Sequence, residues 1–371
     1  METISVEALR TRSFRNLADG ELRLGEGVTL LWGHNGAGKT NLLEALYAAL
    51  AGRSCRTRAD RETIAFGEQL ARAEADVTEG PERREFMFAC ARDEGRRHLL
   101  NGSPAPPAAA RRRPPLAVFM PDRLALVKGP PAARRSHLDG FVAALWPARA
   151  EARKRYSRAL AQRNALVGRI RAGAASADSL AAWDRELAEA GVELMRTRAD
   201  AAEALAGGFA AAAAELGLGD EASLRYRPRS EATSADELAA ELAERRSGDI
   251  VRGFTGHGPH LDELVIARGG RSLRKFGSQG QQRAALLALL FAERSALVEA
   301  GRTPPLMLLD DVTSELDPER RELLCARLLA GGGQALITAT EPAHVPESCP
   351  RREVPVRDGR MLGALDAAEA A

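Results

Sequence analysis

The stretch Gly33-His34-Asn35-Gly36-Ala37-Gly38-Lys39-Thr40 decides the fold of this chain. It matches the pattern G-x-x-x-x-G-K-[ST], in which glycines let the backbone wrap a phosphate with its N–H groups turned inward. It follows the uncharged apolar run Val28–Trp32, which predicts a buried strand, and it precedes leucines at helical spacing over 42–50. A strand before and a helix after are the context that this motif needs, so the stretch predicts a phosphate-binding loop.

The residue types in this loop indicate its chemistry. The Lys39 ammonium would reach the β- and γ-phosphates of a nucleoside triphosphate, and the Thr40 hydroxyl would bind Mg²⁺. The predicted nucleotide site is completed by Gly33, His34, Asn35, Gly36, Ala37, Gly38 and Asn41. A glycine-rich turn that matches by chance is the alternative, and the flanking strand and helix argue against it.

A second apolar run, PLMLL over 305–309, predicts another buried strand that ends in two acids. Asp310 would orient Mg²⁺ through its waters, which is the Walker B role. Asp311 stands where a general base for an attacking water would lie. The alternative is that both acids cap the start of a helix.

Two further motifs fix the class of ATPase. Ser278-Gln279-Gly280-Gln281 opens a helix predicted over 281–298, where a serine and a glycine form an anion site or a plain helix cap. Ser314 to Asp317 follows the two acids. Phosphate loop, signature helix, Walker B and D-loop, in this order, define the ATP-binding-cassette (ABC) head. In that class the signature serine contacts the γ-phosphate bound to a second subunit, so the order predicts a nucleotide-sandwiched dimer. The distance along the chain from Lys39 to Asp310 excludes compact GTPases and kinases.

The composition of the chain excludes several other classes of protein. The 371 residues carry 53 basic and 51 acidic side chains, so a globally basic nucleic-acid coat is excluded and such binding needs a local patch. The four cysteines show neither zinc-type spacing nor a disulfide framework. The N-terminal residues contain no long apolar region, and no apolar run approaches a membrane span. We therefore expect a soluble cytoplasmic protein without a membrane segment.

The amino-acid composition changes along the chain. Residues 134–216 are rich in Ala, Leu, Arg and Glu, which is typical of long helices, with expected breaks at Gly207-Gly208 and over 217–219. Strand-like runs lie before this block and return from Leu264, with a turn at Gly269-Gly270 and a strand expected over 272–276. We predict an α/β fold: an ABC-type P-loop ATPase head over 1–130 and 255–371, split by a mostly helical insert, the second lobe, over 131–254.

Several short blocks carry a more specific resemblance. They are 13–17 (SFRNL), 33–47 (GHNGAGKTNLLEALY), 52–57 (GRSCRT), 121–139 (PDRLALVKGPPAARRSHLD), 258–263 (GPHLDE), 276–283 (FGSQGQQR) and 306–317 (LMLLDDVTSELD). In these blocks the chain resembles the RecF family of bacterial recombination mediators, which are relatives of the SMC-type ATPases. One departure lies at Leu261, where the family usually has Arg.

The resemblance implies roles for further residues. Arg15 would approach the nucleotide phosphates, and Asp122 would lie near Mg²⁺. Asp317 would couple the two nucleotide sites. The signature would comprise Ser278, Gly280 and Gln281, and the switch position would be Thr338 or Thr340.

The resemblance also implies a function. ATP would drive head-to-tail dimerisation of the chain on duplex or gapped DNA, and ATP hydrolysis would follow. The dimer would help RecR and RecO to load RecA at single-strand gaps. Asp311 is one methylene shorter than the Glu of fast cassette ATPases, which suggests a slow, DNA-stimulated switch. Two alternatives stay open: the ATPase subunit of an ABC transporter, and an SMC-like scaffold that binds ATP without hydrolysing it.

The best local DNA patch is the segment 149–173, which holds eight basic residues and one acid. In a helix, Lys154, Arg155, Arg158 and Arg169 would lie largely opposite an apolar face that contains Tyr156. The alternative is a solvated helix face in an Arg-rich protein. His257, His260, Asp262 and Glu263 could form a metal cluster, but we favour a turn segment between the lobes.

Overall fold

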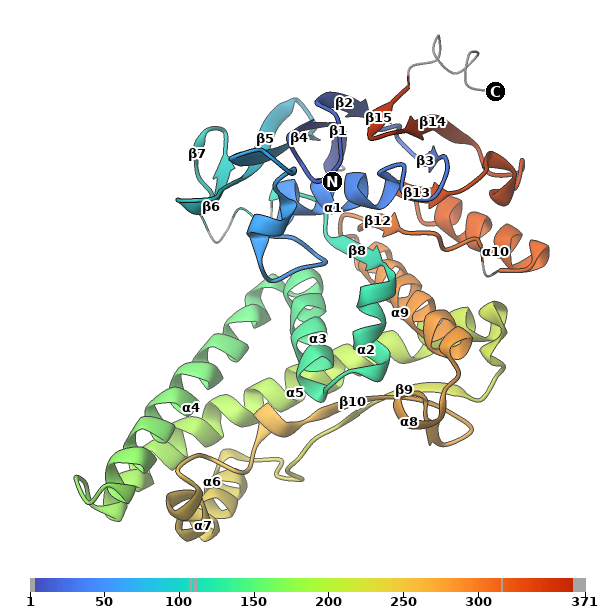
Figure 1. The fold of residues 1–371 in the computed structure, drawn as a ribbon. Coiled ribbons are helices and arrows are strands. Elements are labelled where there is room, and N and C mark those ends of the chain that lie inside the picture. Colours follow the sequence, from blue (N-terminus) through green and yellow to red (C-terminus); the bar gives the residue numbers. More distant parts are fainter. Residues whose placement is uncertain (1–3, 107–108, 110–111, 315, 363–371) are drawn as a thin grey trace. The chain divides into compact units, whose positions relative to one another are not determined.

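The computed structural model of the chain describes residues 4–106, 109, 112–314 and 316–362, except the side chains of Pro121 and Asp122 (Figure 1). The chain divides into two units. The first contains Met1–Arg123 and Leu297–Ala371, and the second contains Leu124–Ala296. The predicted class is confirmed, since the chain has the mixed α/β architecture of an ABC-type head with a large helical segment.

Two six-stranded sheets form the first unit. One is antiparallel, in the order β2-β1-β4-β5-β6-β7. The other has the order β15-β14-β3-β13-β12-β8, and all its neighbours are parallel except β15 and β14. The strands are β1 (Ile4–Arg12), β2 (Gly20–Arg23), β3 (Val28–Trp32), β4 (Leu70–Glu79), β5 (Glu82–Ala91), β6 (Gly95–Leu100), β7 (Ser103–Pro104), β8 (Leu116–Phe119), β12 (Leu306–Leu309), β13 (Ala335–Ala339), β14 (Arg351–Arg357) and β15 (Arg360–Met361).

Helix α1 (Lys39–Ala51) lies in the core of this unit. Every residue from Leu42 to Leu50 is buried, as expected of a helix that is apolar on nearly all sides. Its core cluster includes Phe86 of the antiparallel sheet and Leu308 of the parallel sheet, so α1 joins the two sheets. The described residues of the first unit also form helix α10 (Pro318–Ala330) and short 3-10 turns at η1 (Asp60–Thr63), η3 (Pro121–Leu124) and η8 (Pro342–His344).

The second unit is mainly helical. Helices α4 and α5 pack along each other, and a small sheet has the strand order β11-β10-β9. The helices are α2 (Ala125–Lys128), α3 (Pro131–Leu145), α4 (Ala150–Arg171), α5 (Leu180–Ala213), α6 (Ala235–Glu244), α7 (Arg246–Arg252), α8 (Leu273–Phe276) and α9 (Gln279–Glu299), with 3-10 turns at η4 (Pro147–Arg149), η5 (Ala177–Ser179) and η7 (Pro259–Leu261) and a π-helical turn at η6 (Ala214–Leu218). The strands are β9 (Ala222–Arg227), β10 (Glu263–Arg268) and β11 (Arg271–Ser272).

Two expectations about this unit are wrong. Helix α5 does not stop at Gly207-Gly208; it ends only at the π-helical turn, where Gly217 adopts φ +82°. Gly208 lies close to α9 instead: a Cβ there would be 3.4 Å from Cα of Ala292, in van der Waals contact. The strand expected over 272–276 is only Arg271–Ser272, and the helical turn α8 replaces the rest.

The two units also divide the chain at points other than 130/131 and 254/255. Residues 255–296 belong to the second unit. The reason is the sheet, in which β10 pairs with β9 along its whole length, from Glu263 with Arg227 to Arg268 with Ala222.

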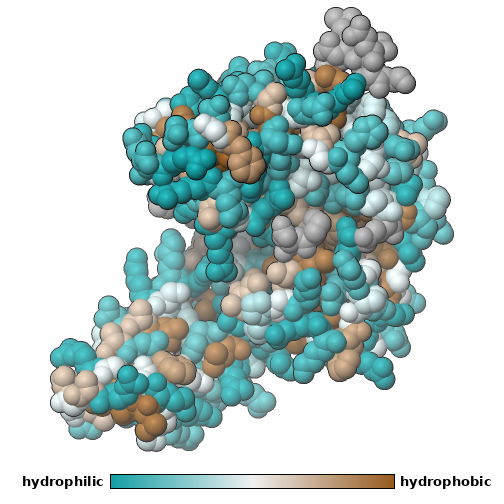
Figure 2. All heavy atoms as spheres, in the orientation of Figure 1, coloured by the Kyte–Doolittle hydropathy of each residue, from teal (hydrophilic) through white to brown (hydrophobic). Residues whose placement is uncertain are grey.

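One helical stretch, Ala177–Leu218, is long and apolar enough to cross a membrane by length and composition alone. It buries Asp184 and Arg198 against protein partners and packs on α4, α6 and β9, so we interpret it as the core helix of the second unit. On the face that Figure 2 draws, hydrophobic side chains form small separate patches among hydrophilic ones.

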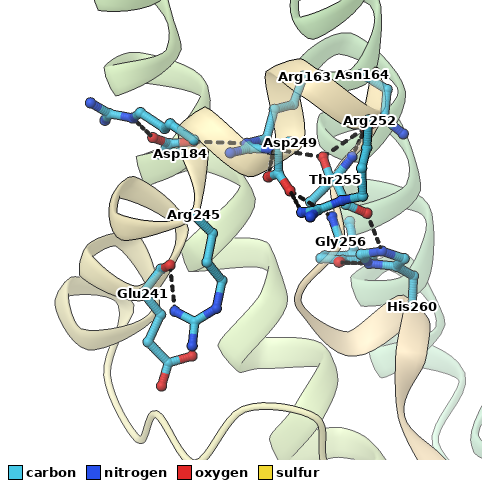
Figure 3. A network of polar contacts seen from close by, with 12 residues as sticks. Arg163, Asn164, Asp184, Glu241, Arg245, Asp249, Arg252, Thr255, Gly256 and His260 are labelled. Atoms are coloured by element: carbon cyan, nitrogen blue, oxygen red, sulfur yellow. Dashed lines mark hydrogen bonds and ion pairs between the residues drawn. The ribbon is translucent and has the colours of Figure 1, made fainter.

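A buried ionic network ties the second unit together (Figure 3). Arg163 of α4 is fully buried and donates to Asp184 Oδ1 of α5 and to Asp249 Oδ2 of α7, both at 2.8 Å. It also donates to Thr255 Oγ1 at 2.7 Å, and Thr255 donates in turn to Asn164 Oδ1. A buried charge is tolerated only with such partners, so this arginine is structural and does not belong to a solvent-facing patch.

We predict that Arg163→Met lowers the free energy of unfolding by about 3 kcal/mol, because it leaves two buried carboxylates short of a partner. Urea unfolding followed by circular dichroism measures the change. The control is Arg158→Met on the exposed side of the same helix, which should change stability by less than about 0.5 kcal/mol. Equal unfolding midpoints for the two variants would contradict the assignment.

Candidate nucleotide site

The candidate site lies where three neighbouring parallel strands end. Leu309 of β12 pairs with Ile337 of β13, and Ile337 pairs with Leu30 of β3. The next residues therefore meet at one edge of the sheet, and they include Asp310 and Thr338. Ligands of open α/β sheets bind outside these carboxyl ends of the strands.

The phosphate loop has the predicted strand and helix on either side, since β3 ends at Trp32 and α1 begins at Lys39. Gly33 requires glycine: its φ is +151°, and a Cβ would lie 2.2 Å from the Val356 oxygen. The Lys39 ammonium donates to the Gly33 and His34 carbonyls at 2.6 and 3.0 Å. Burial lowers the pKa of Lys39, and the neighbouring carboxylates Asp310 and Asp311 oppose that shift.

The Asp310 carboxylate lies between two hydroxyl groups. Thr40 Oγ1 donates to Asp310 Oδ1 at 2.8 Å, and Thr338 Oγ1 donates to the same oxygen at 2.8 Å. Asp310 is only 6% exposed, and this burial raises its pKa, while the two hydroxyl donors act in the opposite direction. The structure thus brings together two of the three predicted metal-binding residues, Thr40 and Asp310.

Asp311 has an unusual backbone and an unsatisfied side chain. Its φ is +49°, a region that non-glycine residues rarely adopt, and its N–H donates to Thr338 Oγ1 at 2.9 Å. Its Oδ1 atom is buried and has no hydrogen-bond partner in the described part of the chain. A buried acceptor in a strained segment next to a phosphate loop is a candidate for taking a proton from water.

Arg15 is held by a buried acid. It donates through Nε and Nη2 to the two carboxylate oxygens of Glu44 at 3.0 and 2.9 Å, and its φ is +55°. Ser54 and Arg56 donate to the same carboxylate at 2.5 and 3.2 Å. Approach of Arg15 to phosphates stays a prediction. We had not predicted Glu44, although a lone acid inside the apolar run 42–50 is a signal for a buried ion pair.

Asn16 and Asn41 link this arginine segment to the loop. Asn16 Nδ2 donates to the Gly36 carbonyl at 3.0 Å, and Asn41 Nδ2 donates to Asn16 Oδ1 at 2.7 Å. Asn16 was likewise missed, although it lies in the block 13–17. Its amide fixes the exposed apex of the phosphate loop.

The signature residues lie in the second unit. Ser278 and Gln281 form a capping box: Gln281 N–H donates to Ser278 Oγ at 3.2 Å, and Ser278 N–H donates to Gln281 Oε1 at 2.9 Å. Ser278 and Gly280 are exposed. Asp317, in the first unit, caps α10 by accepting from Arg320 N–H at 2.9 Å. Asp122 lies in η3, and its side chain is outside the described residues.

The predicted DNA patch is partly neutralised. Lys154 pairs with Glu151 at 2.6 Å, and Arg155 pairs with Glu193 of α5 at 2.5 Å. Arg158 and Arg169 are exposed and make no ion pair with the residues that the structure describes.

Protein partners satisfy the residues weighed as a metal cluster. His257 pairs with Glu241 at 2.5 Å, and His260 Nδ1 hydrogen-bonds to Tyr156 at 2.7 Å. Glu263 accepts both Nε and Nη2 of Arg134 at 2.7 and 3.0 Å. Asp262 binds Arg198 at 3.3 Å. In the described residues no three His, Cys, Asp or Glu side chains gather as a metal site.

Comparison with known proteins gives consistent matches. The family model "RecF/RecN/SMC N terminal domain" matches residues 5–356. A DNA replication and repair protein RecF from Anaeromyxobacter sp. (strain Fw109-5) is 40% identical, over 92% of this chain and 95% of that protein. The RecF protein of Deinococcus radiodurans is 37% identical, over 92% of each chain. A solved structure of the recombination mediator RecF with ATP is 26% identical, covers 98% of each chain and has a TM-score of 0.82.

We predict that Thr338→Val lowers nucleotide hydrolysis by about 10- to 100-fold, because Asp310 loses a donor and the Asp311 N–H loses its acceptor. Loss of that donor raises the pKa of Asp310, so the acid limb of the pH–rate profile should move to higher pH. Phosphate release measured from pH 5 to 8 gives both the rate of hydrolysis and the position of the acid limb.

Thr338→Ser keeps the hydroxyl and should restore both the rate and the pH profile. A valine variant with an unshifted acid limb would show that Thr338 only fills space.

Proposed function

Since this chain belongs to the RecF family of DNA replication and repair proteins, we propose that it is an ATP-driven, DNA-binding switch of recombinational repair. The observation that carries the proposal is the arrangement Thr40–Asp310–Thr338 beside a phosphate loop. ATP binding agrees with this arrangement and with the ATP-bound RecF structures.

The residues present fit Mg²⁺. Thr40 and Asp310 offer a hydroxyl and a carboxylate oxygen at the end of the loop, and hard oxygen donors are what Mg²⁺ prefers. Bound there, the ion would neutralise charge on the β- and γ-phosphates. Asp122 is a further candidate ligand.

Groups of the chain itself would bind the phosphates and accept the proton from water. Backbone N–H groups of Gly36 to Thr40 would hold the phosphates at the start of α1, and the Lys39 ammonium would turn from the loop carbonyls to the phosphate oxygens. The free Oδ1 of Asp311 would accept a proton from the attacking water. Thr338 would keep Asp310 and Asp311 in position.

Hydrolysis would be slow. Asp311 is shorter than a Glu, and its left-handed backbone fixes where the carboxylate can reach. A slow ATPase suits a switch that persists on DNA until it is reset, and DNA would stimulate it.

The signature supports an ATP-dependent homodimer. Ser278, Gly280 and Gln281 are at the N-terminus of a 21-residue helix, and Ser278 and Gly280 are exposed and so accessible to a γ-phosphate held by a second copy. Asp317, at the start of α10, would couple the two nucleotides. The dimer would be head to tail.

The cellular task follows from the family. Duplex or gapped DNA would be the ligand. Of the α4 cations predicted to contact its phosphates, Arg158 and Arg169 would contribute more than Lys154 and Arg155, which already pair with acids. RecR would be the direct protein partner, and RecO and RecA would act downstream. We expect a cytoplasmic location. The relatives named RecF do not favour the transporter or scaffold alternatives.

We predict that a slowly hydrolysed ATP analogue converts the wild-type chain from monomer to dimer in sedimentation velocity. Ser278→Arg should stay monomeric while still binding nucleotide, because the longer cation blocks the exposed signature. The matched control is Ser247→Arg on α7, which is equally exposed and should dimerise normally. Dimerisation of Ser278→Arg at wild-type concentrations would contradict the composite site.

We predict that Asp311→Asn lowers phosphate release by at least about 100-fold and leaves ATP binding intact. With ATP, this variant should stay on duplex or gapped DNA, whereas the wild type should release it as ATP is consumed. Fluorescence anisotropy with ATP, ADP and no nucleotide tests this. Equal DNA affinity in all three states would refute an ATP-driven switch.

A further inference from the structure

A second group of exposed cations in the second unit lies outside α4. It lies on strand β9 and the segment that follows, at Arg225, Arg227 and Arg229, which we call the β9 arginine strip. All three side chains are exposed, and none forms an ion pair with a residue that the structure describes. By contrast, Lys154 and Arg155 of α4 already have acid partners.

The strand geometry places two of these side chains in a row. Alternate residues of a strand share a face and lie about 6.7 Å apart, so Arg225 and Arg227 point to the same side. Strand β9 is an edge of its sheet, since β10 is its only neighbour in the strand order β11-β10-β9. The row is therefore accessible along its length.

The backbone under the strip is fixed by a buried acid. Asp262 is fully buried; it accepts the Arg229 N–H at 2.7 Å and the hydroxyl of Tyr226, which precedes Arg227. Arg198 donates to the same carboxylate at 3.3 Å. The acid opposite Arg227 in the sheet, Glu263, is held by Arg134. The strip is thus preorganised, and the nearest sheet acids are already engaged.

Protection of a sheet edge explains this row only in part. Charged side chains on an edge strand prevent pairing with other chains. Arg229 lies beyond the end of β9, where no edge needs protection, yet its side chain is exposed as well. Glu203 and Glu231 line the same groove as Arg225 without forming an ion pair to it. Arginine forks in a row match a polyanion whose phosphates repeat along a line.

We propose that the β9 arginine strip is the main phosphate-contact surface of the second unit for duplex DNA. The inference rests on the proposed function and adds the location of the surface to it. Contacts of this kind position the protein without reading sequence, so affinity should depend strongly on salt and weakly on base composition.

The test compares two triple variants of the full chain that remove the same charge. In Arg225→Gln/Arg227→Gln/Arg229→Gln, the Kd for a fluorescent 30-base-pair duplex should rise about tenfold or more at low salt. The slope of log K against log salt should fall by about 2.7, or about 0.9 for each contact. In the control Lys154→Gln/Arg155→Gln/Arg158→Gln, the slope should fall by no more than about 0.9, because two of its cations already have acid partners.

Nucleotide binding and thermal melting, measured on both variants, show that each chain is folded. A strip variant that binds duplex with the wild-type Kd and salt slope overturns the assignment. So does an α4 variant that loses as much as the strip variant. If the wild-type chain itself binds no duplex in any nucleotide state, the proposed function fails first, and that outcome is distinct because the wild type alone reveals it.

Discussion

The site depends on one buried carboxylate, Asp310, at the end of β12. Burial of an ionised acid is costly unless donors surround it, and here the donors come from two other elements, Thr40 at the start of α1 and Thr338 on β13. The parallel register makes this meeting unavoidable, because Leu309 and Ile337 are partners and the next residues must be neighbours. Changing that register would separate the acid from both hydroxyls.

The same carboxylate connects the geometry of the phosphate loop to the proposed catalysis. Thr338 Oγ1 donates to Asp310 and accepts from the N–H of Asp311, so one hydroxyl fixes both acids. The backbone of Asp311 then adopts a left-handed conformation and leaves Oδ1 buried without a partner. Strain and an unsatisfied acceptor are both unfavourable in a resting protein, and they coincide at the residue that we propose activates the water.

Much of this arrangement was predictable, because the sequence signals for it depend on residues that are close together in the chain. The glycine pattern, the apolar run before it and the two acids after 305–309 each act through a few neighbouring residues, so β3, α1 and β12 appear where they were expected. Glu44 and Asn16 were missed because their roles depend on partners that only the fold brings close, such as Arg15 and Gly36. Gly207-Gly208 misled because small residues allow close helix packing as well as helix ends.

The charged residues of the second unit also show that sequence alone does not reveal partners that only the fold brings close. In an arginine-rich chain, composition does not distinguish Arg163, which is fully buried between two aspartates, from Arg158 five residues before it, which faces solvent. Helical spacing predicts which face of α4 a residue occupies. It does not predict whether an acid of α5 or α7 lies against that face. After such pairs are assigned, α4, the most basic stretch of sequence, keeps Arg158 and Arg169 as exposed cations without an acid partner in the described part of the chain. The edge strand β9 and the segment after it keep Arg225, Arg227 and Arg229. Local charge density along a chain is therefore a weaker guide to a polyanion surface than the charge that remains after folding has used its ion pairs.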